Sequence, residues 1–249
     1  MSAKSPERPP IATYTPLSSA HRRVQVQQAI LLTSATLFIS AMAADSFLFP
    51  TQPPPMALRV VGSLAALGVL VGLVLEVFTA GYWNHLAACN LTALDRMGFF
   101  AASSNAPWLW HWRGVRSEGL TGPYRATKEL LVHSFPGNEN PPVGGYDPAL
   151  DDPALDEPAL TAPLVHVVPL WIGLDVTRYA LIVAAMKLHM AGPPGTPHSS
   201  LVDFPEGRVL AVAALAAVVG FGAAALNLQI MGKVAADQNA LARAKGLIG

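Results

Sequence analysis

Long apolar runs alternate with polar or proline-rich segments along the chain. Four of these runs reach the length of about 20 residues that crosses the hydrocarbon core of a bilayer. A helix is expected for each, because lipid offers no partner to an unpaired backbone N–H or C=O group. We therefore predict an all-α integral membrane protein with four transmembrane helices, which cover about residues 28–49, 57–83, 164–190 and 208–232.

The polar segments complete the predicted domain organisation. Residues 1–27 are rich in proline and poor in apolar side chains, a composition typical of a disordered tail. Residues 28–249 are predicted to form a single four-helix transmembrane domain. Within it, residues 84–162 form a long loop between the second and third helices, and residues 233–249 form a C-terminal tail.

The long loop has a pattern of its own. An apolar stripe over residues 84–101 predicts that the second helix continues past the membrane, and residues 123–135 have the pattern of a short helix. The loop ends in three pentapeptides over residues 147–161, each with a proline and mostly flanked by acidic residues. Such a repeat favours an extended, solvated linker that leads into the third helix.

Composition supports the membrane assignment. Hydrophobic residues make up 52% of the chain and charged residues only 13%, whereas soluble domains carry about 25% charged residues. The formal net charge is zero, so the chain lacks the basic excess by which proteins bind nucleic acid. We predict no nucleic-acid partner.

The placement of Lys and Arg predicts the orientation. Cytosolic segments of membrane proteins carry an excess of these residues. Twelve of the sixteen basic residues lie in the N-terminal tail, the long loop and the C-terminal tail. They are Lys4, Arg8, Arg22, Arg23, Arg96, Arg113, Arg116, Arg125, Lys128, Lys233, Arg243 and Lys245. We therefore expect both termini and the long loop on the same, cytosolic-equivalent side.

Three charged residues interrupt the apolar runs at membrane depth. Asp175 and Arg178 are three residues apart in the third run, so they share one helix face and can neutralise each other. Helical side chains lean toward the N-terminus, which brings the long Arg178 side chain toward the depth of Glu76 in the second run. A Glu76–Asp175–Arg178 cluster is thus predicted. It would serve as a structural latch between helices or, less favoured, as a relay for a proton, ion or substrate.

A second candidate site lies in the long loop, where aromatic and basic side chains alternate. Trp side chains favour the membrane interface, and Arg side chains favour lipid headgroups. We expect this segment to lie flat on the membrane surface, with a small packed loop as the alternative. Its residues are Trp108, Trp110, Trp112, Arg113 and Arg116.

Glycine pairs in two of the apolar runs indicate close helix packing. Gly68 and Gly72 are spaced as GxxxG, and Gly220 and Gly222 lie among alanines in the last run. Small residues at such positions let helix backbones approach closely in a membrane.

The sequence holds no recognisable catalytic, nucleotide-binding or metal-binding motif, and its single cysteine excludes an internal disulfide. We predict no cofactor and no metal. The leading hypothesis is a non-enzymatic scaffold or accessory subunit of a membrane complex, in contact with lipid and with other membrane-protein subunits or a second copy. The alternatives are a small transporter or channel-like protein that uses the charged cluster, and a membrane enzyme that acts on lipid.

Overall fold

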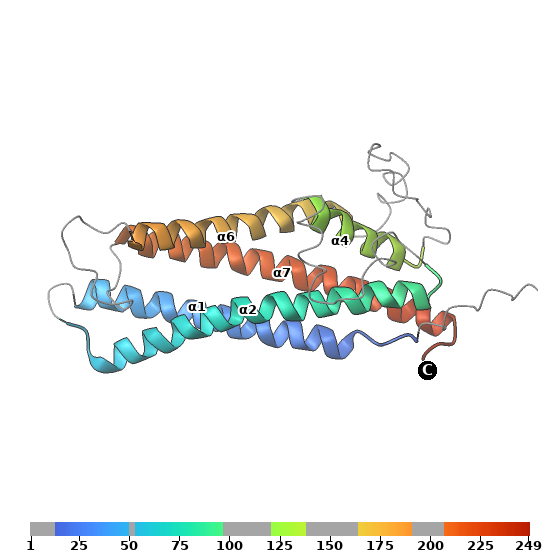
Figure 1. Cartoon of the computed structure of the whole chain (residues 1–249), viewed down its shortest axis with the longest axis horizontal. Helices are drawn as coiled ribbons and strands as arrows, with labels where there is room; N and C mark the ends of the chain where they lie inside the picture. The colour runs from blue at the N-terminus through green and yellow to red at the C-terminus, as the bar shows by residue number, and fades with distance from the viewer. Residues whose placement is uncertain (1–12, 50–52, 97–120, 138–163, 191–206) are drawn as a thin grey trace, which may run out of the picture. The chain divides into compact units, whose positions relative to one another are not determined.

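The computed structural model describes residues 13–49, 53–96, 121–137, 164–190 and 207–249. All regular elements in these ranges are helical (Figure 1). They are α1 (Ser18–Leu48), α2 (Met56–Ala93), α4 (Thr121–Ser134), the short 3₁₀ helix η3 (Val165–Val167), α6 (Val168–Met190) and α7 (Gly207–Ala244).

Four of the helices are long and apolar enough to cross a membrane: α1, α2, α6 with its preceding 3₁₀ turn, and α7. This confirms an all-helical chain with four candidate spans and indicates a multi-pass membrane protein. The sides on which the termini and the long loop lie stay a prediction.

Proline, and residues whose backbone adopts the left-handed conformation, mark the helix ends. Pro55 accepts hydrogen bonds from the backbone N–H groups of Leu58 and Arg59 at the start of α2. At its end, Asp95 takes a positive φ of 56°, and the Arg96 N–H reaches back to the Leu91 carbonyl. That bonding pattern is a Schellman motif, which satisfies carbonyls left open at a helix C-terminus.

Helix α7 ends in the same manner. Gly246 has a φ of 68°, and the Leu247 N–H bonds the Ala242 carbonyl. Glycine carries no Cβ and adopts this conformation at little cost, so the sequence encodes the stop.

The N-terminal boundary corrects the sequence prediction. Helix α1 begins at Ser18, inside the range 1–27 that was expected to be disordered, and Tyr14, Leu17 and Val24 are buried. Proline does not occur after Pro16 in this range, and apolar residues then recur at helical spacing. The predicted tail therefore extended too far into the chain.

The C-terminal boundary also differs from the prediction. Residues 233–249 were expected to form a tail, but α7 continues to Ala244 and buries Val234, Leu241 and Ala242. Polar residues between these positions masked the 3.6-residue apolar period. The expected continuation of the second helix is confirmed as far as Ala93, and α4 confirms the short helix in the long loop.

The chain divides into two compact units, which we call the terminal unit and the span unit. The terminal unit comprises Met1–His21, Gly81–His166 and Ile230–Gly249, and the span unit comprises Arg22–Ala80 and Val167–Gln229. Helices α1, α2 and α7 each contribute residues to both units.

The span unit packs through small residues. A Cβ placed on Gly72 would lie 3.0 Å from the Leu31 Cβ and 3.1 Å from its Cα. A Cβ on Gly68 would collide with the Ser34 side chain, and one on Gly222 would lie 3.3 Å from Leu174 Cδ1. The glycines thus allow α2 to approach α1, and α7 to approach α6, as the sequence predicted.

The terminal unit has a small apolar core of its own. Tyr14, Leu94, Leu241 and Ala242 form one buried cluster, against which Ala93 and Ile248 pack. In α4, Val132 is buried against Phe135 and Val165. These contacts bring the segment before α1 to the ends of α2 and α7.

Candidate functional site

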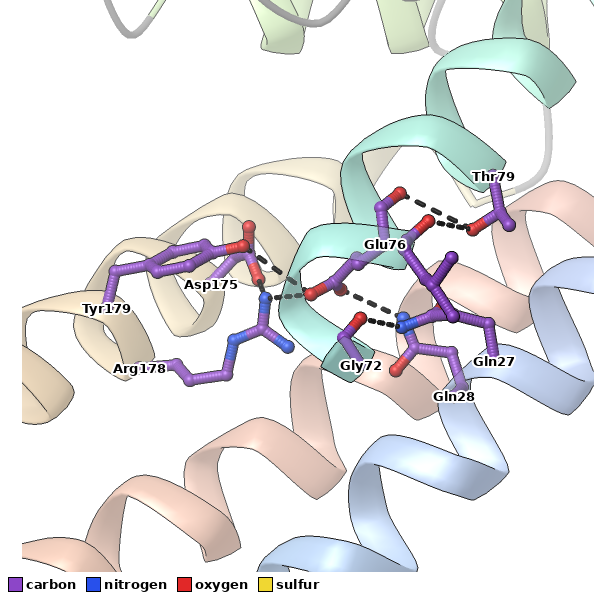
Figure 2. A network of polar contacts seen from close by, with 9 residues as sticks. Gln27, Gln28, Gly72, Glu76, Thr79, Asp175, Arg178 and Tyr179 are labelled. Atoms are coloured by element: carbon purple, nitrogen blue, oxygen red, sulfur yellow. Dashed lines mark hydrogen bonds and ion pairs between the residues drawn. The ribbon is translucent and has the colours of Figure 1, made fainter. Parts of the chain in front are cut away.

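A charged network lies in the span unit, and Arg178 is at its centre (Figure 2). Its Nη2 atom lies 3.0 Å from Glu76 Oε2 and 2.8 Å from Asp175 Oδ1. Asp175 and Arg178 belong to the same helix, α6, whereas Glu76 comes from α2. The structure thus brings together the three charged residues that the sequence singled out.

Two further side chains complete the network, and the sequence analysis missed both. Gln28, from α1, donates through Nε2 to Glu76 Oε1 at 2.9 Å. The Tyr179 hydroxyl lies 3.5 Å from Glu76 Oε2, and its ring centroid is 4.6 Å from the Arg178 guanidinium carbon. Gln28 carried a usable signal, because it is a polar residue at the start of an apolar run.

Helix α7 supports the network through a close contact with the Arg178 stem. A Cβ on Gly220 would lie 3.0 Å from Arg178 Cδ. The absence of a side chain at Gly220 therefore leaves room for the guanidinium to reach Glu76. With this contact, helices α1, α2, α6 and α7 each contribute a residue to the network or to its packing.

Burial falls from the centre of the network to its edge. The side chain of Arg178 is 5% exposed, that of Glu76 13% and that of Asp175 24%. In a low-dielectric surrounding, charges interact more strongly than in water but lose more hydration. The loss of one charge from the network would therefore leave its partners buried without compensation.

The charges in the network do not sum to zero. Glu76 and Asp175 are two carboxylates and Arg178 is one cation, so the ionised network carries one net negative charge. Three polar atoms beside it are buried without a hydrogen-bond partner among the described residues: Gln27 Oε1, Gln28 Oε1 and Arg178 Nε. The two glutamine oxygens are acceptors that a cationic group can use, whereas Arg178 Nε is a donor that needs an acceptor.

A second polar cluster, in the terminal unit, was not predicted; we call it the amide hub. Asn90 exchanges hydrogen bonds with the backbone of Thr15, accepting from its N–H at 2.9 Å and donating to its carbonyl at 2.8 Å. Asn90 also donates to Gln238 Oε1 at 3.1 Å, while Gln238 Nε2 donates to Ala87 O and Ser134 Oγ. Every donor and acceptor of the two amide groups is used.

Other polar contacts surround the amide hub. Tyr14 donates to Asn239 Oδ1 at 2.7 Å, and Arg96 donates to the carbonyls of His133 and Phe135. Burial raises the pKa of the Tyr14 phenol, an effect that Arg243 partly opposes, so the hydroxyl keeps its proton and donates. Lys245 Nζ donates to the Leu94 carbonyl at the end of α2.

His133 is the strongly perturbed titratable group of the terminal unit. Burial, and second the nearby Arg96 charge, lower its pKa from 6.5 to about 4. Its Nδ1 atom is buried without a partner in the described part of the chain. The side chain is therefore neutral at pH 7 and lies on the buried face of α4.

The predicted membrane-surface segment, with Trp108, Trp110, Trp112, Arg113 and Arg116, lies outside the described residues. Among the residues that are described, no group of three or more His, Cys, Asp or Glu could hold a metal ion. The single cysteine, Cys89, has its Sγ 3.6 Å from His85 Nε2.

Comparison of the chain with protein-family models, with curated protein sequences and with solved structures finds no match.

Proposed function

We propose that the protein is a non-enzymatic scaffold or accessory subunit of a membrane complex, and that its charged network acts as a structural latch. The observation that carries this proposal is the surface of α6. Among the α6 residues whose side chains are described, Val168 and Arg178 are buried, and the others are exposed or half-buried. The latch thus fixes a helix that offers most of its surface outward.

Polar groups on the outer part of α6 favour a protein neighbour over lipid. Asp175 is partly exposed at its side chain, and Tyr179 is 38% exposed, at a depth where the surrounding residues are apolar. Polar side chains inside a bilayer commonly face other helices, since hydrocarbon cannot satisfy their hydrogen bonds. A second copy of this chain or another membrane subunit would supply such partners.

Site-specific crosslinking tests the proposal. In a Cys89→Ser background, Val183→Cys places a thiol on α6 at a residue that is 50% exposed. Coupling of the thiol to a membrane-permeant benzophenone maleimide, followed by irradiation of native membranes, should give one discrete species of higher mass, because the excited ketone inserts into C–H bonds of a neighbouring helix. The matched control is Ala223→Cys on α7, which is 1% exposed and should not react.

Native mass determination in mild detergent provides the second readout. A stable particle larger than one chain with its detergent supports the subunit role. A monomer in detergent, together with no crosslink from Val183→Cys in membranes, contradicts it.

The net negative charge favours one alternative, a small cation transporter. That role needs the charges for transport, whereas a latch needs them for folding. Replacing Arg178 and Asp175 together by Leu removes both ion pairs and leaves only Glu76 charged. A protein that needs the charges for folding should recover much of the folded yield that Arg178→Leu alone loses, whereas a transporter loses its flux even when it folds. Ion flux into reconstituted vesicles, measured for the parent and for the folded double variant, separates the two.

A further inference from the structure

Two glutamines of α1 donate to oxygen atoms of the turn Gly72–Glu76 of α2, and their own amide oxygens are left without donors in the part of the chain that the structure describes. Gln27 Nε2 donates to the Gly72 carbonyl at 2.8 Å, and Gln28 Nε2 donates to Glu76 Oε1 at 2.9 Å. Figure 2 shows both amide groups at the α1–α2 contact, beside Gly72 and Glu76. Neither Gln Oε1 has a partner among the described residues.

These two side chains are more than nine-tenths buried. Gln27 is 3% exposed and Gln28 is 1% exposed. Buried acceptors without donors are costly, and native proteins rarely keep them unless an ion or a water molecule satisfies them. Two such acceptors beside a carboxylate indicate a positively charged ligand.

The net charge of the network is an independent argument for a positively charged ligand. Glu76 and Asp175 exceed Arg178 by one negative charge. An uncompensated charge at membrane depth costs several kcal/mol. One additional positive charge would neutralise the network.

We propose that Glu76, Gln27 and Gln28 form a binding site for one monovalent metal cation of the sodium type. Carboxylate and amide oxygens are hard ligands and suit hard cations. The single surplus charge matches a monovalent ion, whereas calcium sites draw on several carboxylates. The site uses oxygens beyond those already engaged by Arg178, so the ion and the arginine bind side by side.

The site is distinct from the proposed subunit role and does not depend on it. The ion would stabilise the contact between α1 and α2, whatever covers α6. The orphaned glutamine oxygens would also make this contact respond to the cation composition of the medium.

Thermal unfolding of the full-length protein in detergent tests the site. A ligand that binds only the folded state raises Tm with its concentration. Tm should rise when sodium chloride replaces choline chloride at constant ionic strength, and the rise should saturate. Lithium chloride is a second probe, and potassium chloride reports the size preference.

Single substitutions identify the residues on which the sodium dependence of Tm relies. Gln28→Leu removes one orphaned oxygen, together with the Nε2 donor to Glu76, and leaves all three charges, so it should weaken the apparent sodium affinity about tenfold or more. Gln27→Leu should act in the same direction, and Glu76→Gln should abolish the sodium dependence. Thr177→Val, which alters an exposed α6 hydroxyl bonded to the Gly173 carbonyl of its own helix, is the matched control and should keep it.

Three outcomes overturn the proposal. The first is equal Tm values in sodium chloride and choline chloride. The second is a sodium dependence that survives both glutamine variants. The third is a Tm that changes with pH but not with sodium, which would mean that the network takes up a proton. Because Gln27→Leu and Gln28→Leu retain the ion pairs, the test holds even if Glu76→Gln does not fold.

Discussion

The charged network and the amide hub solve the same problem with different chemistry. Both fix side chains from several helices at a buried point. The amide hub uses neutral groups, and Asn90 and Gln238 have every donor and acceptor engaged. The charged network uses ions, carries one surplus negative charge and leaves polar atoms without partners in the described residues.

This difference indicates which of the two clusters can bind a ligand. The amide hub is neutral and its hydrogen bonds are complete, so a ligand would add nothing to it. Its hydrogen bonds join helices α2, α4 and α7 to Thr15, which lies before α1. A charged set with spare acceptors can still take up a cation. The proposed cation response therefore belongs to the charged network and not to the amide hub.

The largest expected effect comes from breaking the charge balance in the span unit. Arg178→Leu leaves Glu76 and Asp175 without their common partner. Removal of one partner from a buried ion pair typically costs about 3 to 5 kcal/mol, while apolar replacement of the whole set can be neutral. Folded yield in detergent, measured by size-exclusion chromatography, should fall sharply.

Adding Asp175→Leu to that variant should restore much of the yield, because it removes one of the two stranded charges. The control Thr177→Val, on the same helix, should change the yield little. If Arg178→Leu folds as well as the parent, water solvates the charges and the latch is wrong.

A pH titration sharpens the comparison at His133 in the terminal unit. The folded pKa of about 4 lies below the unfolded value of 6.5. The unfolded state therefore binds more protons between these values, so stability is complete above pH 6.5 and declines as the pH falls toward 4. The loss reaches about 3 kcal/mol by the conversion of a pKa difference into free energy.

His133→Gln, which does not titrate in this range, should flatten the decline. Hydrogen exchange of the α4 amides at pH 4.5 and pH 7 measures it locally. A decline that persists unchanged in His133→Gln assigns the acid sensitivity to another group.

Removing an amide group from the amide hub should destabilise the protein less than removing a charge from the charged network. Gln238→Leu strands the Asn90 N–H and the Ser134 hydroxyl, and a buried unsatisfied polar group costs about 1 to 3 kcal/mol. Amide exchange in α4 should accelerate by about tenfold or more, since about 1.4 kcal/mol corresponds to a factor of ten. Ala236→Leu, at an exposed position of α7, should leave the exchange unchanged. Equal exchange in Gln238→Leu would mean that α4 is held by apolar contacts alone.

The smallest effect is expected at the edge of the terminal unit. Tyr14→Phe removes the hydroxyl that donates to Asn239, and one neutral hydrogen bond contributes about 1 kcal/mol. Thr15→Val is the matched control, because Thr15 binds Asn90 through its backbone and its side chain is exposed. Thermal unfolding should lower Tm for Tyr14→Phe only. A larger loss for Thr15→Val would contradict the backbone assignment.

The sequence by itself determined the helices and the central ion pairs. Apolar length predicts spanning helices, because a bilayer has a fixed thickness. The i,i+3 spacing of Asp175 and Arg178 places them on one face, and the direction of helical side chains points Arg178 toward Glu76. Local geometry and membrane depth were enough for these inferences.

Only the tertiary structure decided the rest. Gln238 bonds Asn90 across 148 residues of sequence, and Arg178 meets Gly220 from another helix. Helical periodicity repeats every few residues and carries no information about which faces meet at such separations. The amide hub and the places of Gln28 and Tyr179 depend on such contacts between helices, because burial against a neighbour gave these polar residues their partners. The two misjudged helix ends, in contrast, could be read from the apolar spacing and from Gly246.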